Sequence, residues 1–196
     1  MRTEDEAARW RRLIDLLAPF HDAARRTARR LCLSPDAGDD LFQEAVLRSF
    51  EKLPALRDET SFRSWFYAVL LSMHRSRSRR GFWRRFVSFD EGVERDGGPA
   101  GENGAEWEEE RTRAERASRA LATLPAVQRE AVVLFEEDGL SIEEVSAVQR
   151  VSVSAVKSRL ARGRARLRRH YERLGFGGNG ARSRAAGGPL TEGGVR

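Results

Sequence analysis

The sequence has 196 residues and contains little cysteine, few histidines and no long apolar run. Its single cysteine, Cys32, excludes an internal disulfide and any zinc site built from several cysteines. The three histidines His21, His74 and His170 are scattered and lack metal-ligand spacing. We therefore expect no metal and no other cofactor.

Membrane-spanning and targeting segments are also missing. The longest apolar stretch, FYAVLLSM, is too short to cross a bilayer, and MRTEDEAARWRR lacks the apolar core of a signal peptide. Neither a phosphate-binding glycine loop nor a nucleophile motif is present. The sequence predicts a soluble, intracellular protein without membrane insertion, with no catalytic residues and no enzymatic activity.

The charge that is present is mostly arginine and is unevenly spread. The formal net charge is +6, and only Lys52 and Lys157 are lysines. Basic blocks at 74–85 and 157–173 flank an acidic, glycine-rich stretch at 89–110. A charge run is by default a solvated surface, but two basic blocks around an acidic linker favour two separate contacts with a polyanion.

Apolar residues recur at helical spacing through most of the chain. The spacing predicts helices over 4–31, 39–53 and 62–80, and again over 111–123, 126–138, 142–150 and 153–171. Ser34, Ser141 and Ser152 are placed as helix caps, and the sequence SIEE forms a capping box. The predicted fold class is therefore all-α, with two small helical domains joined by a flexible acidic linker.

The predicted boundaries follow from these changes in composition. We expect a helical bundle at 5–86, the linker at 87–110, and a second helical domain at 111–174. The glycine-rich remainder, 175–196, predicts a disordered tail.

Two short helices joined by a tight turn, the second of them basic, are typical of a helix-turn-helix. On the second helix Val156, Leu160, Gly163, Leu167 and Tyr171 share one side, which is suited to packing. The early positions off this stripe are suited to contacts with base edges. Arg164, Arg166, Arg168 and Arg169 lie further along and are better placed for phosphates or an acidic protein.

Here the chain resembles a known family. The segment GLSIEEVSAVQRVSVSAVKSRLARGRARLRRHY, with LPAVQREAVVLFEEDGL before it, resembles the promoter-reading region 4 of sigma-70 factors. The segments DAGDDLFQEAVLRSF and ETSFRSWFYAVLLSMHRSRSRR resemble region 2 of the same family. The short connection without a third domain is similar to the extracytoplasmic function (ECF) subgroup. The resemblance covers residues 10–171.

The resemblance implies a sigma factor that binds core RNA polymerase, recognises −35 and −10 promoter elements and aids promoter melting. The implied partners are the β′ clamp and β flap of the polymerase, promoter DNA and an anti-sigma factor. The implied location is the bacterial cytoplasm, at the nucleoid.

The resemblance also assigns residues. For the −35 element it implies Arg150, Lys157, Ser158, Ala161 and Arg162. For the −10 element and the melted strand it implies Leu56, Arg57, Asp58, Ser61, Arg63, Trp65, Tyr67, Ser72, Arg75 and Arg79. For polymerase docking it implies Asp40, Leu41, Gln43, Glu44 and Leu47.

Several positions depart from the family pattern. Leu56, Asp58 and Ser72 stand where Phe, Gly and Asn are usual, so the choice of −10 base stays open. Gln149 replaces an apolar residue. Arg150 replaces a turn glycine at a cost of about 1 kcal/mol if its backbone is left-handed. Gly163 replaces alanine, which weakens a helix by roughly 1 kcal/mol.

Alternative interpretations remain open at this point. Trp65 is suited either to core packing or to stacking on a base. A one-component DNA-binding regulator would use only the C-terminal helix-turn-helix, and an adaptor would bind acidic proteins with its basic faces. The aromatic and basic N-terminal domain favours the sigma factor, because a simple repressor needs no polymerase-docking helix.

Overall fold

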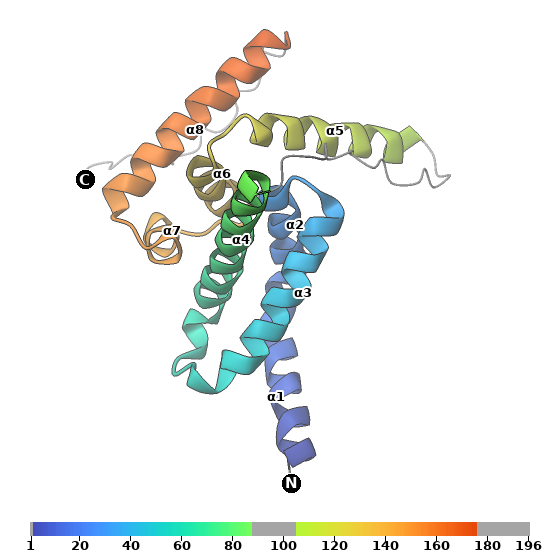
Figure 1. The fold of residues 1–196 in the computed structure, drawn as a ribbon, viewed down its shortest axis with the longest axis vertical. Coiled ribbons are helices and arrows are strands. Elements are labelled where there is room, and N and C mark those ends of the chain that lie inside the picture. The colour runs from blue at the N-terminus through green and yellow to red at the C-terminus, as the bar shows by residue number, and fades with distance from the viewer. Residues whose placement is uncertain (1, 88–104, 176–196) are drawn as a thin grey trace, which may run out of the picture.

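The computed structural model describes residues 2–87 and 105–175, and the regular secondary structure in these ranges is helical. The N-terminal half consists of α1 (Arg2–Leu17), α2 (His21–Cys32), α3 (Pro35–Lys52) and α4 (Phe62–Val87), with 3-10 turns at Ala18–Phe20, Leu53–Ala55 and Glu59–Ser61. The C-terminal half consists of α5 (Ala105–Ala122), α6 (Ala126–Val132), the π-helical turn η4 (Val133–Glu137), α7 (Ile142–Gln149) and α8 (Val153–Arg173) (Figure 1). The all-α prediction is confirmed.

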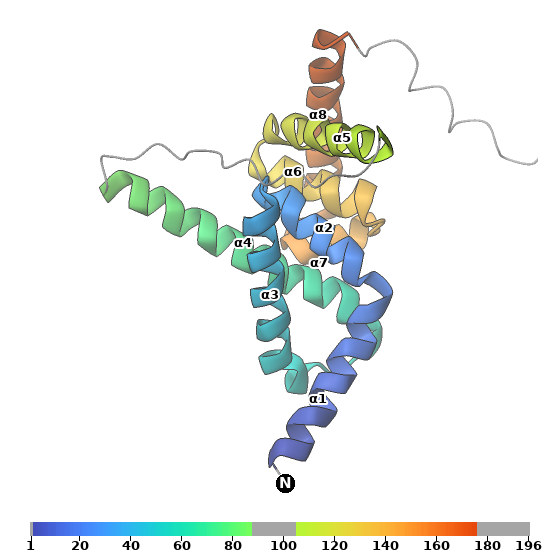
Figure 2. The same cartoon turned by 90° about the vertical axis from the view of Figure 1, so that its right-hand side faces the viewer.

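Helix boundaries differ from the prediction in three places. The helix expected over 4–31 breaks at Ala18–Phe20, because Pro19 lacks a backbone N–H and its ring crowds the preceding turn. Helix α4 continues to Val87, and its far end projects away from the other helices (Figure 2). Helix α5 begins at Ala105, so residues 105–110, expected in the linker, are helical. The rest of the predicted linker, 88–104, and the predicted tail from residue 176 lie outside the described residues.

The start of α3 shows how the sequence sets the packing of the N-terminal half. Ser34 caps the helix by accepting a hydrogen bond from the Ala37 amide at 3.4 Å, and Pro35 occupies the first helical turn. Gly38 lies against α2, where an added β-carbon would be 2.3 Å from the Arg29 Cα atom. Only glycine therefore allows α2 and α3 to approach this closely.

An ion-pair cluster holds the same two helices together. The Asp39 carboxylate on α3 accepts two hydrogen bonds each from Arg25 and Arg29 on α2, at 2.7–2.9 Å. These hydrogen bonds hold the pKa of Asp39 well below its ordinary value. Bidentate guanidinium–carboxylate pairs fix orientation as well as distance, so they define how α3 lies on α2.

In the C-terminal half, α5, α6 and α7 all pack on α8. Helix α8 packs on α6 through Val156, Leu160 and Gly163, which are all buried. Helix α7 packs on the N-terminal part of α8, and α5 contacts α8 from another side. The apolar stripe predicted for the last helix is thus confirmed in its first three positions.

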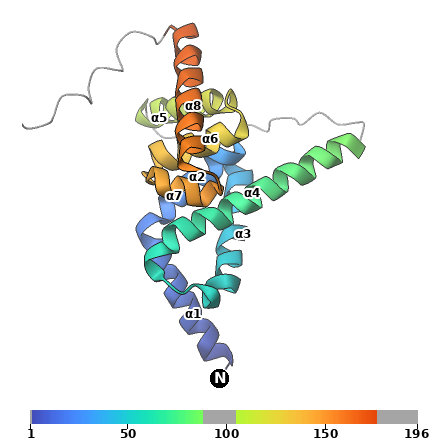
Figure 3. The same ribbon diagram turned by 90° about the vertical axis from the view of Figure 1, so that its left-hand side faces the viewer.

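The two halves share one hydrophobic core. Helix α7 runs beside α4 (Figure 3), and η4 contacts α2. Leu134, Leu140 and Val145 from the C-terminal half join the same buried cluster as Phe66 and Leu70 of α4. The protein as described is therefore closed, with its C-terminal half packed on its N-terminal bundle.

Candidate nucleic-acid interface

The predicted helix-turn-helix is formed by α7 and α8. The capping box is present: Ser141 Oγ accepts from the Glu144 amide at 3.1 Å, and the Glu144 carboxylate accepts from the Ser141 amide at 2.7 Å. Arg150 ends α7 in the left-handed region, with φ 55° and ψ 52°. Ser152 caps α8 by accepting from the Ala155 amide at 3.3 Å. These three local features set the angle between the two helices.

The beginning of α8 presents a polar face to solvent. Lys157, Ala161 and Arg162 are exposed, Ser158 is half-buried, and Arg150 is exposed at the turn before them. Within the described residues none of these three basic side chains forms an ion pair. The four of the assigned residues that belong to α8 thus lie on the side of that helix opposite buried Val156 and Leu160, and Arg150 precedes them at the turn.

Gln149 has a role that its sequence position did not reveal. Its side chain is buried; the amide donates to the Val127 carbonyl at 3.1 Å and to Glu130 Oε2 at 3.2 Å. Its Oε1 accepts from Arg159 Nη1 at 2.9 Å. Gln149 therefore orients Arg159 beside the exposed face of α8. The signal in the sequence was the polar residue itself at a position suited to an apolar one.

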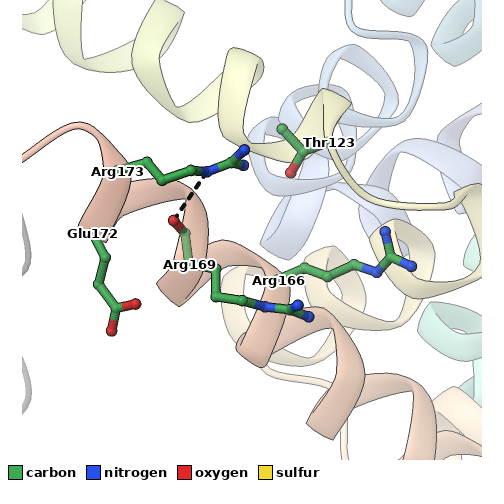
Figure 4. A pocket seen from close by; sticks show the side chains of 5 residues that line it. All are labelled: Thr123, Arg166, Arg169, Glu172 and Arg173. Carbon is green, nitrogen blue, oxygen red and sulfur yellow. Dashed lines mark hydrogen bonds between the residues drawn. The ribbon is translucent and has the colours of Figure 1, made fainter.

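The later arginines of α8 divide into two groups. Arg164 pairs with Glu136 at 2.6 Å, so its charge is used within the C-terminal half. Arg166, Arg169 and Arg173 line a hollow of about 620 Å³ together with Thr123 and Glu172, and the three arginine side chains extend in a similar direction (Figure 4). This second group is a basic surface separate from the start of the helix.

The loop before α4 is closed by Asp58. Its carboxylate accepts from the amide and the hydroxyl of Thr60, at 2.9 and 2.7 Å. Ser61 Oγ donates to the Asp58 carbonyl at 2.7 Å. Aspartate at this position thus stabilises the turn by side-chain capping, a physical reason for the departure from glycine. Leu56 is half-buried, whereas Arg57 is exposed.

The aromatic residues of α4 are mostly internal. Phe62 and Phe66 are buried, as expected for core residues, and Tyr67 is also completely buried. Burial, and then the negative charge of Asp138, raise the pKa of Tyr67. Trp65 is half-buried, with its ring 5.7 Å from that of Phe62. In this closed conformation Trp65 presents aromatic surface and Tyr67 presents none.

Two arginines of the predicted −10 set are bound by the C-terminal half. Arg75 Nη2 donates to Glu130 Oε2 at 2.6 Å and its Nε donates to Oε1 at 3.1 Å. Arg63 donates to the Asp138 carbonyl. Ser72 and Arg79, in contrast, are exposed.

The predicted docking helix is α3. Asp40, Gln43, Glu44 and Leu47 are exposed, and Leu47 keeps 56% of its surface accessible. Leu41 is fully buried, so in this structure it supports the helix from within and does not contribute to the docking face. Glu44 forms an ion pair with Arg77 of α4 across a groove of about 340 Å³.

A second groove lies between α5, α6 and α8. Its volume is about 320 Å³, and its apolar lining includes Leu121, Val132 and Leu167. Glu136 and Arg164 provide charges at its edge. The groove combines apolar lining residues with a few charged ones, a composition that suits protein docking.

The described residues contain no cluster of His, Cys, Asp or Glu that could hold a metal ion. In the same part of the chain, no helix is both long enough and apolar enough to span a membrane.

Two family models match the chain in the expected order. Residues 16–89 match the model of sigma-70 region 2, and residues 114–167 match that of sigma-70 region 4. The chain is 31% identical over 156 residues to the ECF RNA polymerase sigma factor EcfG of Rhodopseudomonas palustris, which covers 78% of this chain and 81% of EcfG. It is 30% identical over 164 residues to the ECF sigma factor SigM of Mycobacterium tuberculosis; this match covers 84% of this chain and 79% of SigM.

The fold is similar to solved structures as well. One is the sigma factor RpoE in complex with the anti-sigma factor NepR from Bartonella quintana, with a TM-score of 0.62 and 24% identity over 80% of this chain and 94% of that one. Another is CnrH in complex with the cytosolic domain of CnrY, with a TM-score of 0.64 and 23% identity; the match covers 87% of this chain and 94% of CnrH.

The chain therefore belongs to the ECF subgroup of the sigma-70 family of RNA polymerase sigma factors. Proteins of this class direct transcription initiation and are not themselves enzymes.

Proposed function

We propose that this protein selects promoters through −35 and −10 elements, helps to open the −10 region, and works at the nucleoid of the bacterial cytoplasm. The observation that best supports the proposal is the helix-turn-helix, which exposes Lys157, Ala161 and Arg162 on a side fixed by the buried stripe of α8. Arginine and lysine at the start of a recognition helix suit contacts with guanine and phosphate in the major groove.

The −10 region would be bound by the loop 56–61 and by α4. Half-buried Trp65 supplies a stacking surface, and Arg63, Arg75 and Arg79 supply positive charge along the same helix. Stacking and phosphate attraction are the interactions that hold a single strand once its base pairs are lost. Tyr67 would contribute only if the closed arrangement opens, because it is fully buried here.

Two surfaces fit the polymerase. Leu47 is an exposed apolar residue among the polar side chains of Asp40, Gln43 and Glu44, which suits docking on the β′ clamp. The apolar groove between α5, α6 and α8 suits the β flap. The solved complexes of RpoE with NepR and CnrH with CnrY support an anti-sigma factor as a further partner.

Run-off transcription with purified core polymerase on genomic fragments tests the proposal, and start-site mapping then identifies the promoters. Addition of the protein should create specific start sites, and Leu47→Gln should reduce both core binding and transcription. Ile14→Gln is the matched control, because Ile14 is exposed to a similar extent, 59% against 56%. Specific DNA binding without any core-dependent transcription would instead support a one-component regulator.

A further inference from the structure

The C-terminal part of α8 carries arginines that the two proposed DNA surfaces do not use. Arg166, Arg169 and Arg173 line the hollow of about 620 Å³, together with Thr123 of the α5–α6 turn and Glu172. All three arginines are exposed. Within the part of the chain that the structure describes, none of the three forms an ion pair. Their charges are therefore available to an anion from outside the protein.

Two of these arginines are held against their own helix. Arg169 Nε donates to the Ala165 carbonyl at 3.3 Å, and Arg173 Nε donates to the Arg169 carbonyl at 3.3 Å (Figure 4). Contacts of this kind stabilise the C-terminal end of a helix. Because each contact uses only Nε, the terminal nitrogens of both guanidinium groups can still donate to a ligand. The contacts also restrict the side chains in advance, which lowers the entropic cost of binding.

The spacing of the arginines indicates a ligand with several anionic groups. Arg166 and Arg173 are seven residues apart, which corresponds to about 10 Å along a helix axis. Single phosphate ions are smaller than this spacing, whereas a chain of linked phosphates presents oxygens over most of it. Guanidinium groups bind phosphate oxygens with paired, charge-assisted hydrogen bonds.

The composition of the hollow favours a small ligand over a protein segment. Its volume lies within the range of roughly 300–1,000 Å³ that is typical of small-molecule sites. Protein docking depends on aromatic or large apolar anchors that fill pockets. The described residues that line the hollow offer no large apolar side chain, whereas the groove between α5, α6 and α8 offers Leu121, Val132 and Leu167.

Duplex DNA is assigned to a different part of the same helix. Lys157, at the start of α8, precedes Arg166 by about two and a half turns. The hollow is also bounded on its other side by Thr123, so it is a concave site and not a continuation of the exposed face at the beginning of α8.

We propose that this hollow binds an oligophosphate, either an inorganic phosphate chain or the phosphate tail of a nucleotide, through Arg166, Arg169 and Arg173. Glu172 is the one acidic side chain among the described lining residues, and it opposes the anion. Because Thr123 belongs to the α5–α6 turn, a ligand in the hollow joins that turn to α8 and stabilises the C-terminal half against unfolding. The site goes beyond the proposed function and does not depend on which promoter elements the protein recognises.

Isothermal titration calorimetry of the full-length protein at physiological ionic strength tests the proposal. The probes are inorganic tripolyphosphate, ATP without a metal ion, and orthophosphate. Tripolyphosphate should bind saturably at a single site, and orthophosphate should bind far more weakly. Equal affinities for tripolyphosphate and ATP would show that the phosphates alone are recognised. Tighter binding of ATP would show that the nucleoside adds contacts and that the ligand is a nucleotide.

Arg169→Gln is the main variant and Arg168→Gln is its matched control. Both remove one exposed charge from adjacent positions of α8, but Arg168 does not line the hollow. We expect Arg169→Gln to weaken tripolyphosphate binding about tenfold, as the loss of one hydrogen-bonded charge requires. Arg168→Gln should change it by less than about twofold, and Glu172→Gln should tighten it about threefold, because exposed charges act weakly through water. Arg166→Gln carries the test if circular dichroism shows that Arg169→Gln does not fold.

Thermal unfolding gives an independent measurement. Tripolyphosphate should raise the Tm of wild type and of Arg168→Gln, and it should raise the Tm of Arg169→Gln much less. Equal losses of affinity in Arg168→Gln and Arg169→Gln would mean diffuse attraction to a basic helix, and the proposal would be wrong. It would also be wrong if hexaglutamate or a short DNA duplex of random sequence bound in an Arg169-dependent way while tripolyphosphate did not, because the occupant would then be an acidic protein segment or DNA.

Discussion

Gly163 of α8 packs directly on Val132 of α6: a β-carbon added at Gly163 would lie 2.8 Å from Val132 Cγ2. Alanine is a better helix former than glycine by roughly 1 kcal/mol. At this position, however, the methyl group would push the two helices apart. The glycine that weakens α8 locally is therefore what allows α8 to lie close to α6.

We expect Gly163→Ala to destabilise the protein by about 1–3 kcal/mol, because overpacking outweighs the gain in helix propensity. Urea unfolding monitored by circular dichroism measures the change. Val132→Ala should remove the obstacle, so the double variant should be more stable than the sum of the two single changes predicts. Additive effects would show that the helices already have room for the methyl group.

Arg150→Gly should stabilise the fold by about 1 kcal/mol, because glycine adopts the left-handed conformation of Arg150 without steric cost. The same substitution should weaken promoter binding if Arg150 contacts the −35 region. Leu33 is the informative comparison, since its φ is 58° but its side chain packs against the core. Leu33→Gly should therefore destabilise. A loss of stability in Arg150→Gly would contradict the strain argument.

Asp138 should make stability depend on pH. Burial raises the pKa of Asp138 from 3.8 to about 6, while Thr27, Tyr67 and Arg63 act in the opposite direction and Glu137 adds to the rise. The folded protein thus holds this proton more tightly than the unfolded chain. Its contribution to stability is greatest below pH 4 and is lost as pH rises through 6.

The measurement is the difference in unfolding free energy between wild type and Asp138→Asn at pH 5 and pH 7.5. Between pH 5 and pH 7.5 the unfolding free energy of the asparagine variant should rise by about 1.4 kcal/mol relative to wild type, because the carboxylate already opposes folding in part at pH 5 and a tenfold change in the equilibrium remains. Burial lowers the pKa of His74, which acts in the opposite sense, but both proteins contain His74 and its effect cancels. A difference that is constant with pH would rule out an ionised, buried Asp138.

Arg162→Ala and Arg168→Ala should have different effects on the choice among −35 sequences. Arg162 lies near the start of α8 and should read or orient the −35 element, so its loss should cost about 1–3 kcal/mol at one base pair. Arg168 lies almost two turns further along and should not affect base choice. Holoenzymes carrying each variant are to be assayed on a saturation series of −35 sequences. A uniform loss for Arg162→Ala, or a changed ranking for Arg168→Ala, would show that DNA lies elsewhere on the helix.

Local signals in the sequence predicted the secondary structure well. Ser34, Ser141 and Ser152 are caps because a hydroxyl beside free backbone amides has one favourable partner, and the structure confirms all three. The single helix predicted over 4–31 is interrupted at Pro19. The prediction was wrong there because apolar periodicity shows only which side chains share a helix face, whereas proline removes a backbone hydrogen bond.

Contacts between distant segments were not predictable in the same way. Nothing near Arg75 in the sequence indicates that it pairs with Glu130, 55 residues away. Leu41 was expected to contact the polymerase but is buried. Apolar residues on α3 occur both on the side that packs in the core, such as Leu41, and on the exposed side, such as Leu47, and helical spacing alone does not distinguish the two sides. Which face meets a partner depends on the packing of the whole bundle.

Because the two halves pack on each other, substitutions at residues in contact between the halves should be correlated among related sequences. A substitution at Arg75 leaves a carboxylate buried in the other half, and one at Glu130 leaves a guanidinium without its anion. Related sequences that keep the two halves packed together should therefore change at the positions of Arg75 and Glu130 together, although one position lies in region 2 and the other in region 4. Sequences that have lost the pairing should carry uncharged residues at both.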